Sequence, residues 1–313
     1  MNEKLKGILF GIISAICYGT NPLGALFLYE EGLNTNSIIF YRFFLASILL
    51  GLLMLFQKKS FYVTKREIFI LAILGILFGI SALALYSSFL YMDAGIACTI
   101  LFVFPVFVAI ILAIFFKEKI SLITAISIFL ALVGIALLYK GGDIKLNFIG
   151  VMIVLFSALF YAIYIVISNK SSIFMSSIKL TFYVSIFCTL TIFIYSLFDS
   201  SKSIELLTTA NMWLYALMLA IVPTILSLIF LAKAIQIIGS TPTAIVGAFE
   251  PLTAVLIGVT IFDEKFTLQI SIGISLILIS VILIIIGKSM SLEKIFTTIH
   301  KVKYTFLRYW RWK

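Results

Sequence analysis

Ten apolar runs occupy most of the chain, and each is about as long as a helix that crosses a lipid bilayer. A hydrocarbon core of roughly 30 Å needs about 20 helical residues at roughly 1.5 Å each. Because 63% of the residues are hydrophobic and only 12% are charged, a soluble domain is excluded. The sequence therefore predicts an all-α integral membrane protein with ten transmembrane helices, at residues 7–29, 36–56, 68–90, 94–116, 122–139, 147–168, 178–198, 213–236, 242–262 and 268–287.

Lysine and arginine gather in every second loop, and this asymmetry predicts the orientation of the chain. Cytoplasmic loops of membrane proteins are enriched in these residues. With both termini in the cytoplasm, seventeen of them lie inside and four outside, and without the C-terminal tail the ratio is ten to four. The net charge of +10 therefore reflects the cytoplasmic loops and does not indicate a nucleic-acid partner. The first run follows a basic start, MNEKLK, but is too long for a signal peptide, so we expect a retained helix.

An internal repeat divides the chain into two halves. The run VFPVFVAIILAIFFKEK, with Pro105, matches AFEPLTAVLIGVTIFDEK, with Pro251, at an offset of 146 residues. Tyr18 matches Tyr161 at an offset of 143, so each half holds five helices and the second enters the membrane from the opposite side. Chance alignment of apolar sequence is the alternative, and the paired prolines and paired EK endings argue against it. Inverted repeats of this kind are common in secondary transporters, which bind substrate between the halves.

The repeat predicts five parts of the chain. These are a cytoplasmic N-terminus (1–6), a first five-helix repeat (7–140), an external linker (141–146), a second five-helix repeat (147–288) and a cytoplasmic tail (289–313). In the tail, apolar residues recur at helical spacing and basic residues occupy the other faces. We expect a basic amphipathic helix bound to anionic lipid, with Trp310 and Trp312 at the headgroups; a disordered basic tail is the alternative.

Arg42 early in the second helix, in FYRFFLASILLGLL, and the two proline-containing runs occur here in a fairly specific order. With the ten helices in two repeats, the chain resembles the EamA-like branch of the drug/metabolite transporter superfamily, from Gly7 to Gly287. The resemblance implies a carrier for small metabolites in the bacterial inner membrane, often an exporter, without a nucleotide cofactor. Lys233 departs from the pattern, because we expect a neutral residue at that place in the eighth helix.

Three charged residues lie inside the apolar runs, where they are costly and usually face a cavity or a partner. Arg42 lies about 9 Å from the outer end of its helix, so it either snorkels outward or places a fixed positive charge for a carboxylate or phosphate. Lys233 and Glu250 lie about 8 and 12 Å from the cytoplasmic side. Snorkelling is the alternative for Lys233, and a protonated or paired structural carboxyl for Glu250. We expect Lys233 and Glu250 to pair, either as a gate or as a permanent fastener between two helices.

Tyrosines and prolines interrupt several of the apolar runs. A tyrosine offers an apolar body and one hydroxyl, which suits the lining of a polar path, although packing alone is the common role. The predicted substrate-binding residues are Tyr18, Asn21, Arg42, Tyr86, Tyr161, Tyr164, Lys233 and Glu250. The candidate helix-bending residues are Pro22, Pro105, Pro223 and Pro251. Gly75 and Gly79 are expected to allow close helix packing rather than to mark a site.

Motifs of enzymes and of nucleotide-driven pumps are missing from the sequence. The single histidine, His300, is in the tail, no residues have metal-ligand spacing, and no phosphate-binding loop or nucleophile motif is present. The three cysteines lie in apolar runs, so free thiols are expected. We predict a non-enzymatic carrier without cofactor or metal that moves small metabolites, such as amino acids or other organic anions and zwitterions, by alternating access. A channel or facilitator is the alternative, and a membrane-embedded transferase is a more distant one.

Overall fold

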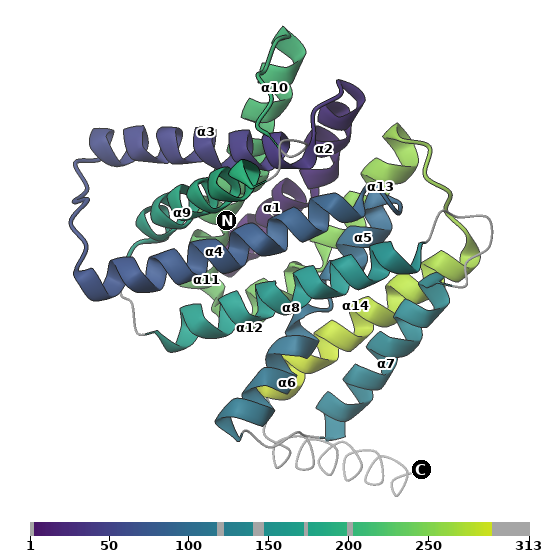
Figure 1. Cartoon of the computed structure of the whole chain (residues 1–313). Coiled ribbons are helices and arrows are strands. Elements are labelled where there is room, and N and C mark those ends of the chain that lie inside the picture. Colours follow the sequence, from purple (N-terminus) through teal and green to yellow (C-terminus); the bar gives the residue numbers. More distant parts are fainter. Residues whose placement is uncertain (1–2, 118–121, 140–146, 172–174, 199–202, 290–313) are drawn as a thin grey trace, which may run out of the picture.

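The computed structural model describes residues 3–117, 122–139, 147–171, 175–198 and 203–289, and within them every regular element is a helix (Figure 1). Eight helical stretches in these ranges are long and apolar enough to cross a membrane, and two further apolar helices are shorter. The predicted all-α membrane class is therefore confirmed. The predicted tail helix lies outside the described residues.

Six helices run without interruption, and polar caps fix where several of them begin. Thr64 accepts a hydrogen bond from the Glu67 backbone while the Glu67 carboxylate accepts one from the Thr64 backbone, which makes a capping box. Asn34 and Ser176 cap two other helices in the same sense. The six are α3 (Thr35–Phe56), α4 (Lys65–Ser88), α7 (Leu122–Tyr139), α8 (Phe148–Lys170), α9 (Ser177–Leu197) and α14 (Leu268–Ser289).

Four of the predicted spans are each built from two or three shorter segments. These are α1 (Glu3–Gly19) with α2 (Asn21–Glu30), α5 (Ala94–Leu101) with α6 (Phe104–Phe116), α10 (Ala210–Leu219) with the π-helical turn η2 (Ala220–Leu226) and α11 (Ser227–Ile238), and α12 (Ser240–Val246) with α13 (Phe249–Ile261). Pro22, Pro105 and Pro251 lie in the first turns of α2, α6 and α13, and Pro223 lies inside η2. A proline has no N–H for the helix ladder, so these breaks fall where the ladder is weakest.

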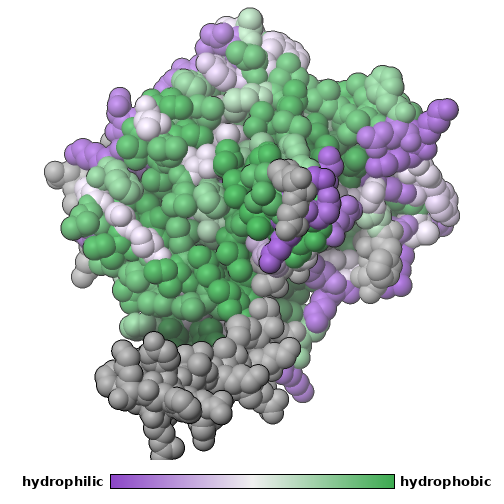
Figure 2. All heavy atoms as spheres, turned by 180° about the vertical axis from the view of Figure 1, so that it is seen from behind, coloured by the Kyte–Doolittle hydropathy of each residue, from purple (hydrophilic) through white to green (hydrophobic). Residues whose placement is uncertain are grey.

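Helices from the two halves of the chain pack against each other throughout the bundle (Figure 1). α4 lies against α8 and α9, α1 against α11 and α13, α3 against α9, α5 against α13, and α7 against α14. Figure 2 shows that apolar residues cover most of one face, and Phe56, Phe69 and Phe115 are among the large exposed apolar side chains. A surface this apolar requires lipid around it.

Two buried serine pairs join the halves at corresponding places. The Ser14 hydroxyl donates to the Ser227 carbonyl at 2.8 Å. The Ser81 hydroxyl donates to the Ser157 carbonyl at 3.0 Å, and the Ser157 hydroxyl donates to the Ser81 carbonyl at 2.7 Å. Ser157 follows Ser14 by 143 residues and Ser227 follows Ser81 by 146, so each pair contains the repeat equivalents of the other pair.

Candidate functional site

Arg42 of α3 is buried, with only 2% of its surface exposed. Its Nε donates a hydrogen bond to Thr224 Oγ1 at 3.0 Å, and its Nη1 donates to Tyr86 Oη at 2.8 Å. The guanidinium also lies 5.1 Å from the centre of the Phe43 ring. The arginine therefore does not snorkel to the outer interface, and its charge is held among α3, α4 and η2.

Thr224 reaches Arg42 because of the proline that precedes it. Pro223 has no N–H, so the Leu219 carbonyl, four residues earlier, loses its usual helical donor. The Thr224 hydroxyl donates to that carbonyl at 2.9 Å, and its oxygen remains free to accept from Arg42. The π-helical turn η2 gives Thr224 this position, and such turns often occur at functional sites.

Asn21 compensates in a similar way for a missing backbone donor at the break between α1 and α2. Pro22 leaves the Tyr18 carbonyl without a helical donor, and Asn21 Nδ2 donates to it at 2.8 Å. The Asn21 Oδ1 then accepts a hydrogen bond from Tyr86 Oη at 3.2 Å. Asn21 is 2% exposed and Tyr86 is completely buried, so the two broken helices and α4 form one connected polar network around Arg42.

The network contains no carboxylate to balance the guanidinium charge. Tyr86, Thr224 and the neighbouring Tyr18 hydroxyl are all neutral groups. Within the described part of the chain, Arg42 forms no ion pair. A buried cation without a counter-ion is costly, so the site is suited to bind an anion.

An aromatic cluster lies beside this network. The rings of Tyr161 and Tyr164 on α8 are stacked, with centroids 5.8 Å apart and planes 8° apart. Phe104, at the start of α6, packs against Tyr161 at 4.6 Å, and Phe78 of α4 packs against Tyr164 at 5.1 Å. Tyr161 also interacts electrostatically with Tyr18. The cluster therefore presents an apolar aromatic surface next to the polar network of Arg42.

Glu250 faces the same region from the first turn of α13. It is half-buried, and its charge interacts with Tyr18, Cys98 and Tyr161. Among the described residues, its carboxylate has no hydrogen bond and no ion pair. The structure thus places a cationic group and an acidic group at the same aromatic cluster.

Lys233 lies elsewhere. Its side chain is exposed, and its ammonium lies 5.5 Å from the Phe10 ring and 5.7 Å from the Phe230 ring. The predicted ion pair of Lys233 with Glu250 is not formed in this structure, because Lys233 points to the face that carries these two rings.

We expect Lys233→Met to leave both expression and transport within about twofold of wild type. The lost cation–π contacts are worth only about 0.5–1 kcal/mol at an exposed site, and methionine keeps the packing against Phe10 and Phe230. Size-exclusion profiles and uptake into proteoliposomes measure the two quantities. A variant that fails to fold would instead make Lys233 a structural fastener.

The structure brings together seven of the eight predicted residues and adds Thr224. Arg42, Tyr86, Asn21 and Tyr18 belong to the polar network; Tyr161, Tyr164 and Glu250 surround it. The sequence signal that could have found Thr224 is a hydroxyl residue directly after a proline within an apolar run. Their contact with substrate stays a prediction.

A hollow of about 830 Å³ lies elsewhere in the molecule, and none of the residues of the Arg42 network lines it. Its walls come from α3, α4, α8 and α9, and they include Ile80, Leu83, Met152 and Phe156. No charged residue lines it, so it lacks the groups that would select a charged metabolite.

Comparison with known proteins identifies the family of the chain. The sequence model of the EamA-like transporter family matches residues 5–140 and, a second time, residues 148–286. An uncharacterized transporter from Archaeoglobus fulgidus is 26% identical over 272 residues, which is 87% of this chain and 93% of that protein. One from Clostridium kluyveri is 24% identical over 288 residues, covering 89% of this chain and 92% of that protein.

Two further matches are a relative that aligns with only part of the sequence and a solved structure with a similar fold. An uncharacterized transporter from Haemophilus influenzae is 29% identical over 140 residues, which is 44% of this chain and 45% of that protein. A solved structure described only as the crystal structure of a protein has the same fold, with a TM-score of 0.62 at 16% identity, covering 88% of this chain and 95% of that one. Because the family model matches both halves, the chain belongs to the EamA-like transporter family.

Proposed function

We propose that this membrane transporter is a secondary exporter of small metabolites that carry an anionic group, such as amino acids or other organic anions and zwitterions. The observation that carries the proposal is the buried guanidinium of Arg42, which is bonded only to neutral oxygens of Tyr86 and Thr224. A carboxylate or phosphate would supply the missing counter-charge, and a guanidinium binds either in a bidentate way. The stacked Tyr161 and Tyr164 rings offer an apolar surface for the rest of the substrate.

Glu250 extends the proposal to zwitterions. Its carboxylate faces the aromatic cluster from α13, while Arg42 faces it from α3. A molecule with a carboxylate at one end and an amine at the other would match both charges. A simple anion would use only Arg42 and would gain nothing from Glu250.

We further propose ten transmembrane helices arranged as two inverted five-helix repeats. The exchanged serine pairs support this arrangement, and so does the family model, which matches the chain twice. A methyl group built on Gly7 would lie 2.5 Å from Ile238, and one built on Gly150 would lie 3.3 Å from Met92. These contacts correspond at the same offsets of 143 and 146 residues. The short α7 and α13 would then be two of the ten spans.

Alternating access would rely on the four proline breaks. Segments that are only 7 to 13 residues long, such as α5, α6, α12 and α13, can tilt separately at the breaks between them. Substrate binding between the two halves would move the breaks at Pro22 and Pro223, because Asn21 and Thr224 link these breaks to the Arg42 network. Substrate binding at Arg42 would in this way be coupled to bending of the two broken helices.

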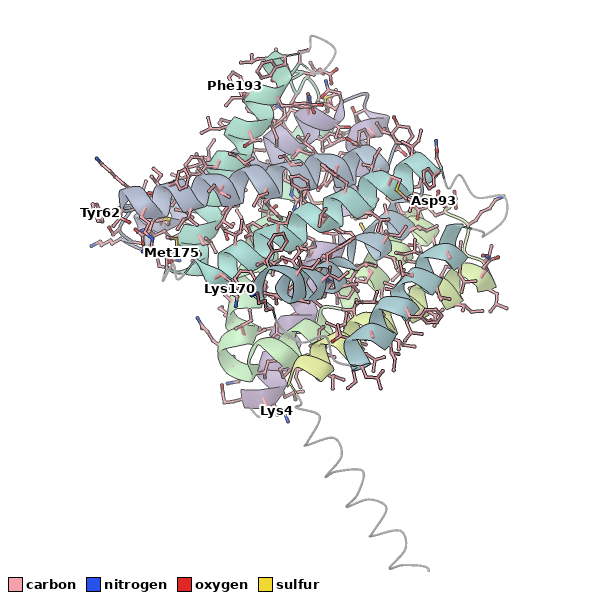
Figure 3. All side chains as sticks on the ribbon, turned by 60° about the horizontal axis from the view of Figure 1, so that its bottom comes forward. Lys4, Tyr62, Asp93, Lys170, Met175 and Phe193 are labelled. Atoms are coloured by element: carbon pink, nitrogen blue, oxygen red, sulfur yellow. The ribbon has the colours of Figure 1, made fainter. Side chains whose placement is uncertain are left out.

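The orientation, with both termini in the cytoplasm of a bacterial inner membrane, is also a proposal. Lys179 donates a hydrogen bond to the Tyr62 carbonyl, which brings the basic loop after α3 next to the start of α9. Tyr62 and Met175 lie together at one edge of the bundle (Figure 3). Basic residues on one side favour the cytoplasmic face, with the anionic lipid of that leaflet as partner.

The test is transport by the purified protein in liposomes. Vesicles loaded with a metabolite mixture are diluted, and the released compounds are identified by mass spectrometry against empty-vesicle controls. We expect saturable release of anionic or zwitterionic compounds. A substrate-independent ionic conductance would favour a channel, and chemical conversion without translocation would favour an enzyme.

A further inference from the structure

The Glu264 carboxylate connects the two halves of the chain. It lies between α13 and α14, and its Oε1 accepts a hydrogen bond from the Ala94 backbone N–H at 2.7 Å. Its Oε2 accepts one from the Gly95 backbone N–H at 3.2 Å. These N–H groups begin α5 and have no partner within that helix, so the second half supplies the cap for a helix of the first half.

Two glycines make the space that this carboxylate occupies. A methyl group on Gly258 would lie 2.0 Å from Glu264 Oε2, and one on Gly95 would lie 2.9 Å from the same atom. The Gly95 methyl would also meet the backbone of Val255 at 2.8 Å. Only glycine at both positions allows α5 to lie directly on α13 with the carboxylate between them.

The Glu264 contact lies at one end of the α5 and α13 pair. A cavity of about 440 Å³ adjoins it and is lined by Tyr29, Glu30, Asp93, Phe262 and Glu264, among others. Asp93 lies at the opposite edge of the bundle from Tyr62 and Met175 (Figure 3). Under the proposed orientation, this cavity opens toward the outside.

The repeat does not reproduce the two glycines on the other side. At the offset of 146, Gly258 corresponds to Leu112 and Gly95 to Thr241. The matching positions therefore lack the glycines that make room for the carboxylate of Glu264. The equivalent acid, Glu118, lies outside the described residues. α6 and α12, the equivalents of α13 and α5, do not pack closely in the described part of the chain.

We propose that Glu264 is a gate residue that holds α5 against α13 while the transporter is closed to the outside. Opening to the outside requires its carboxylate to leave the Ala94 and Gly95 N–H groups. Because Leu112 and Thr241 occupy the positions that match the two glycines, the device acts on one side only and favours the state closed to the outside. The inference rests on the proposed alternating-access function.

External pH gives the gate a measurable signature. Burial, with the nearby Asp93 charge, raises the pKa of Glu264 to about 7, even though the two N–H groups act in the opposite direction. The other charged groups at this place are Glu30 on α2 and the neighbouring Asp263 and Lys265. In the open state, Glu264 would meet water and its pKa would return to about 4.3. The closed state then binds more protons, so acidification from about pH 7 toward 4.3 favours closure.

Spin labels across the gate would report its opening directly. Leu90, which is 61% exposed, and Phe266, which is 53% exposed, are suitable label positions on the two sides. The labels are placed in an otherwise cysteine-free full-length protein and measured by double electron–electron resonance in liposomes. The native thiols to replace are Cys17, Cys98 and Cys188.

We expect one short distance for the reference protein at pH 6 and a growing long-distance population toward pH 8.5. Glu264→Ala removes both acceptors, and Gly258→Ala displaces the carboxylate, so each should raise the open-to-closed ratio about tenfold. Glu264→Gln keeps a carbonyl oxygen as acceptor but has no titratable charge. The gate of this variant should therefore stay closed at all pH values. Asp263→Asn is the matched control, because Asp263 is exposed and its φ of 51° suits asparagine.

The proposal fails if Glu264→Ala and Gly258→Ala both fold, as judged by size-exclusion profiles, and both keep the reference distances throughout the pH range. It also fails if Asp263→Asn opens the gate as much as Glu264→Ala does. The measurement requires no substrate. A protein that opens and closes as expected but releases no metabolite would contradict only the proposed function.

Discussion

Replacing Arg42 with methionine is expected to lower the initial transport rate at least about 100-fold. A charge-assisted hydrogen bond contributes about 1.5–3 kcal/mol, and a bidentate carboxylate would lose two of them. Since about 1.4 kcal/mol corresponds to a factor of ten, this loss amounts to two decades or more. Release from proteoliposomes, with a compound found in the metabolite screen, measures the effect.

The methionine variant is expected to fold, which separates binding from stability. Tyr86, Asn21 and Thr224 keep the hydrogen bonds that they make with one another or with the backbone, and the cost of burying a charge disappears. Arg42→Lys is the matched control, because it keeps the charge but loses the planar fork. We expect it to recover less than a tenth of the wild-type rate. A methionine variant that transports normally would make Arg42 a structural residue.

The membrane class, the breaks and most of the site residues could be predicted from the sequence. Helix length and hydrophobicity are set by the bilayer, so apolar runs translate directly into spans. The four breaks coincide with prolines because a missing N–H has a local effect that needs no tertiary information. The burial of Arg42 was one of two alternatives, and only packing against α4 and η2 decides between them.

Contacts between helices were harder to predict, because counting residues gives depth but not direction. Residue counting predicts similar depths for Lys233 and Glu250, yet a side chain can point to any face of its helix. In the structure, the Lys233 ammonium lies near the Phe10 and Phe230 rings, whereas Glu250 interacts electrostatically with Tyr18 and Tyr161. Periodicity could not separate these faces, since most residues of both helices are apolar and the few polar ones do not mark a single stripe.

Thr224 and Glu264 escaped prediction for a related reason. Thr224 gains its role only because a π-helical turn brings its hydroxyl to the Leu219 carbonyl. Glu264 lies in a short polar loop, and its importance depends on two glycines that are 169 and 6 residues earlier in the chain. Such groups can be recognised only when the helices that they join have been placed.

The last prediction concerns two glycines of α4, Gly75 and Gly79, which lie one helical turn apart. Each is replaced by alanine. Gly75→Ala is expected to destabilise the protein by about 1–3 kcal/mol, because overpacking forces backbones apart. A methyl group on Gly75 would lie 2.3 Å from the Phe187 Cβ and 3.1 Å from the Phe187 backbone, so α9 must move as a whole. Its displacement would also strain the hydrogen bond from Cys188 Sγ to the Gly75 carbonyl, at 3.2 Å.

Gly79→Ala is the matched control for Gly75→Ala. Its methyl group would lie 3.6 Å from the Cys188 backbone and 3.7 Å from Thr191, which is ordinary van der Waals contact. Since alanine favours a helix by about 1 kcal/mol over glycine, this variant should be as stable as wild type or more stable. Thermal unfolding in detergent, followed by the loss of the monodisperse size-exclusion peak, would compare the two variants. Equal melting temperatures would mean that the close approach of α4 and α9 at Gly75 does not limit stability, because the gain in helix propensity is the same at both positions.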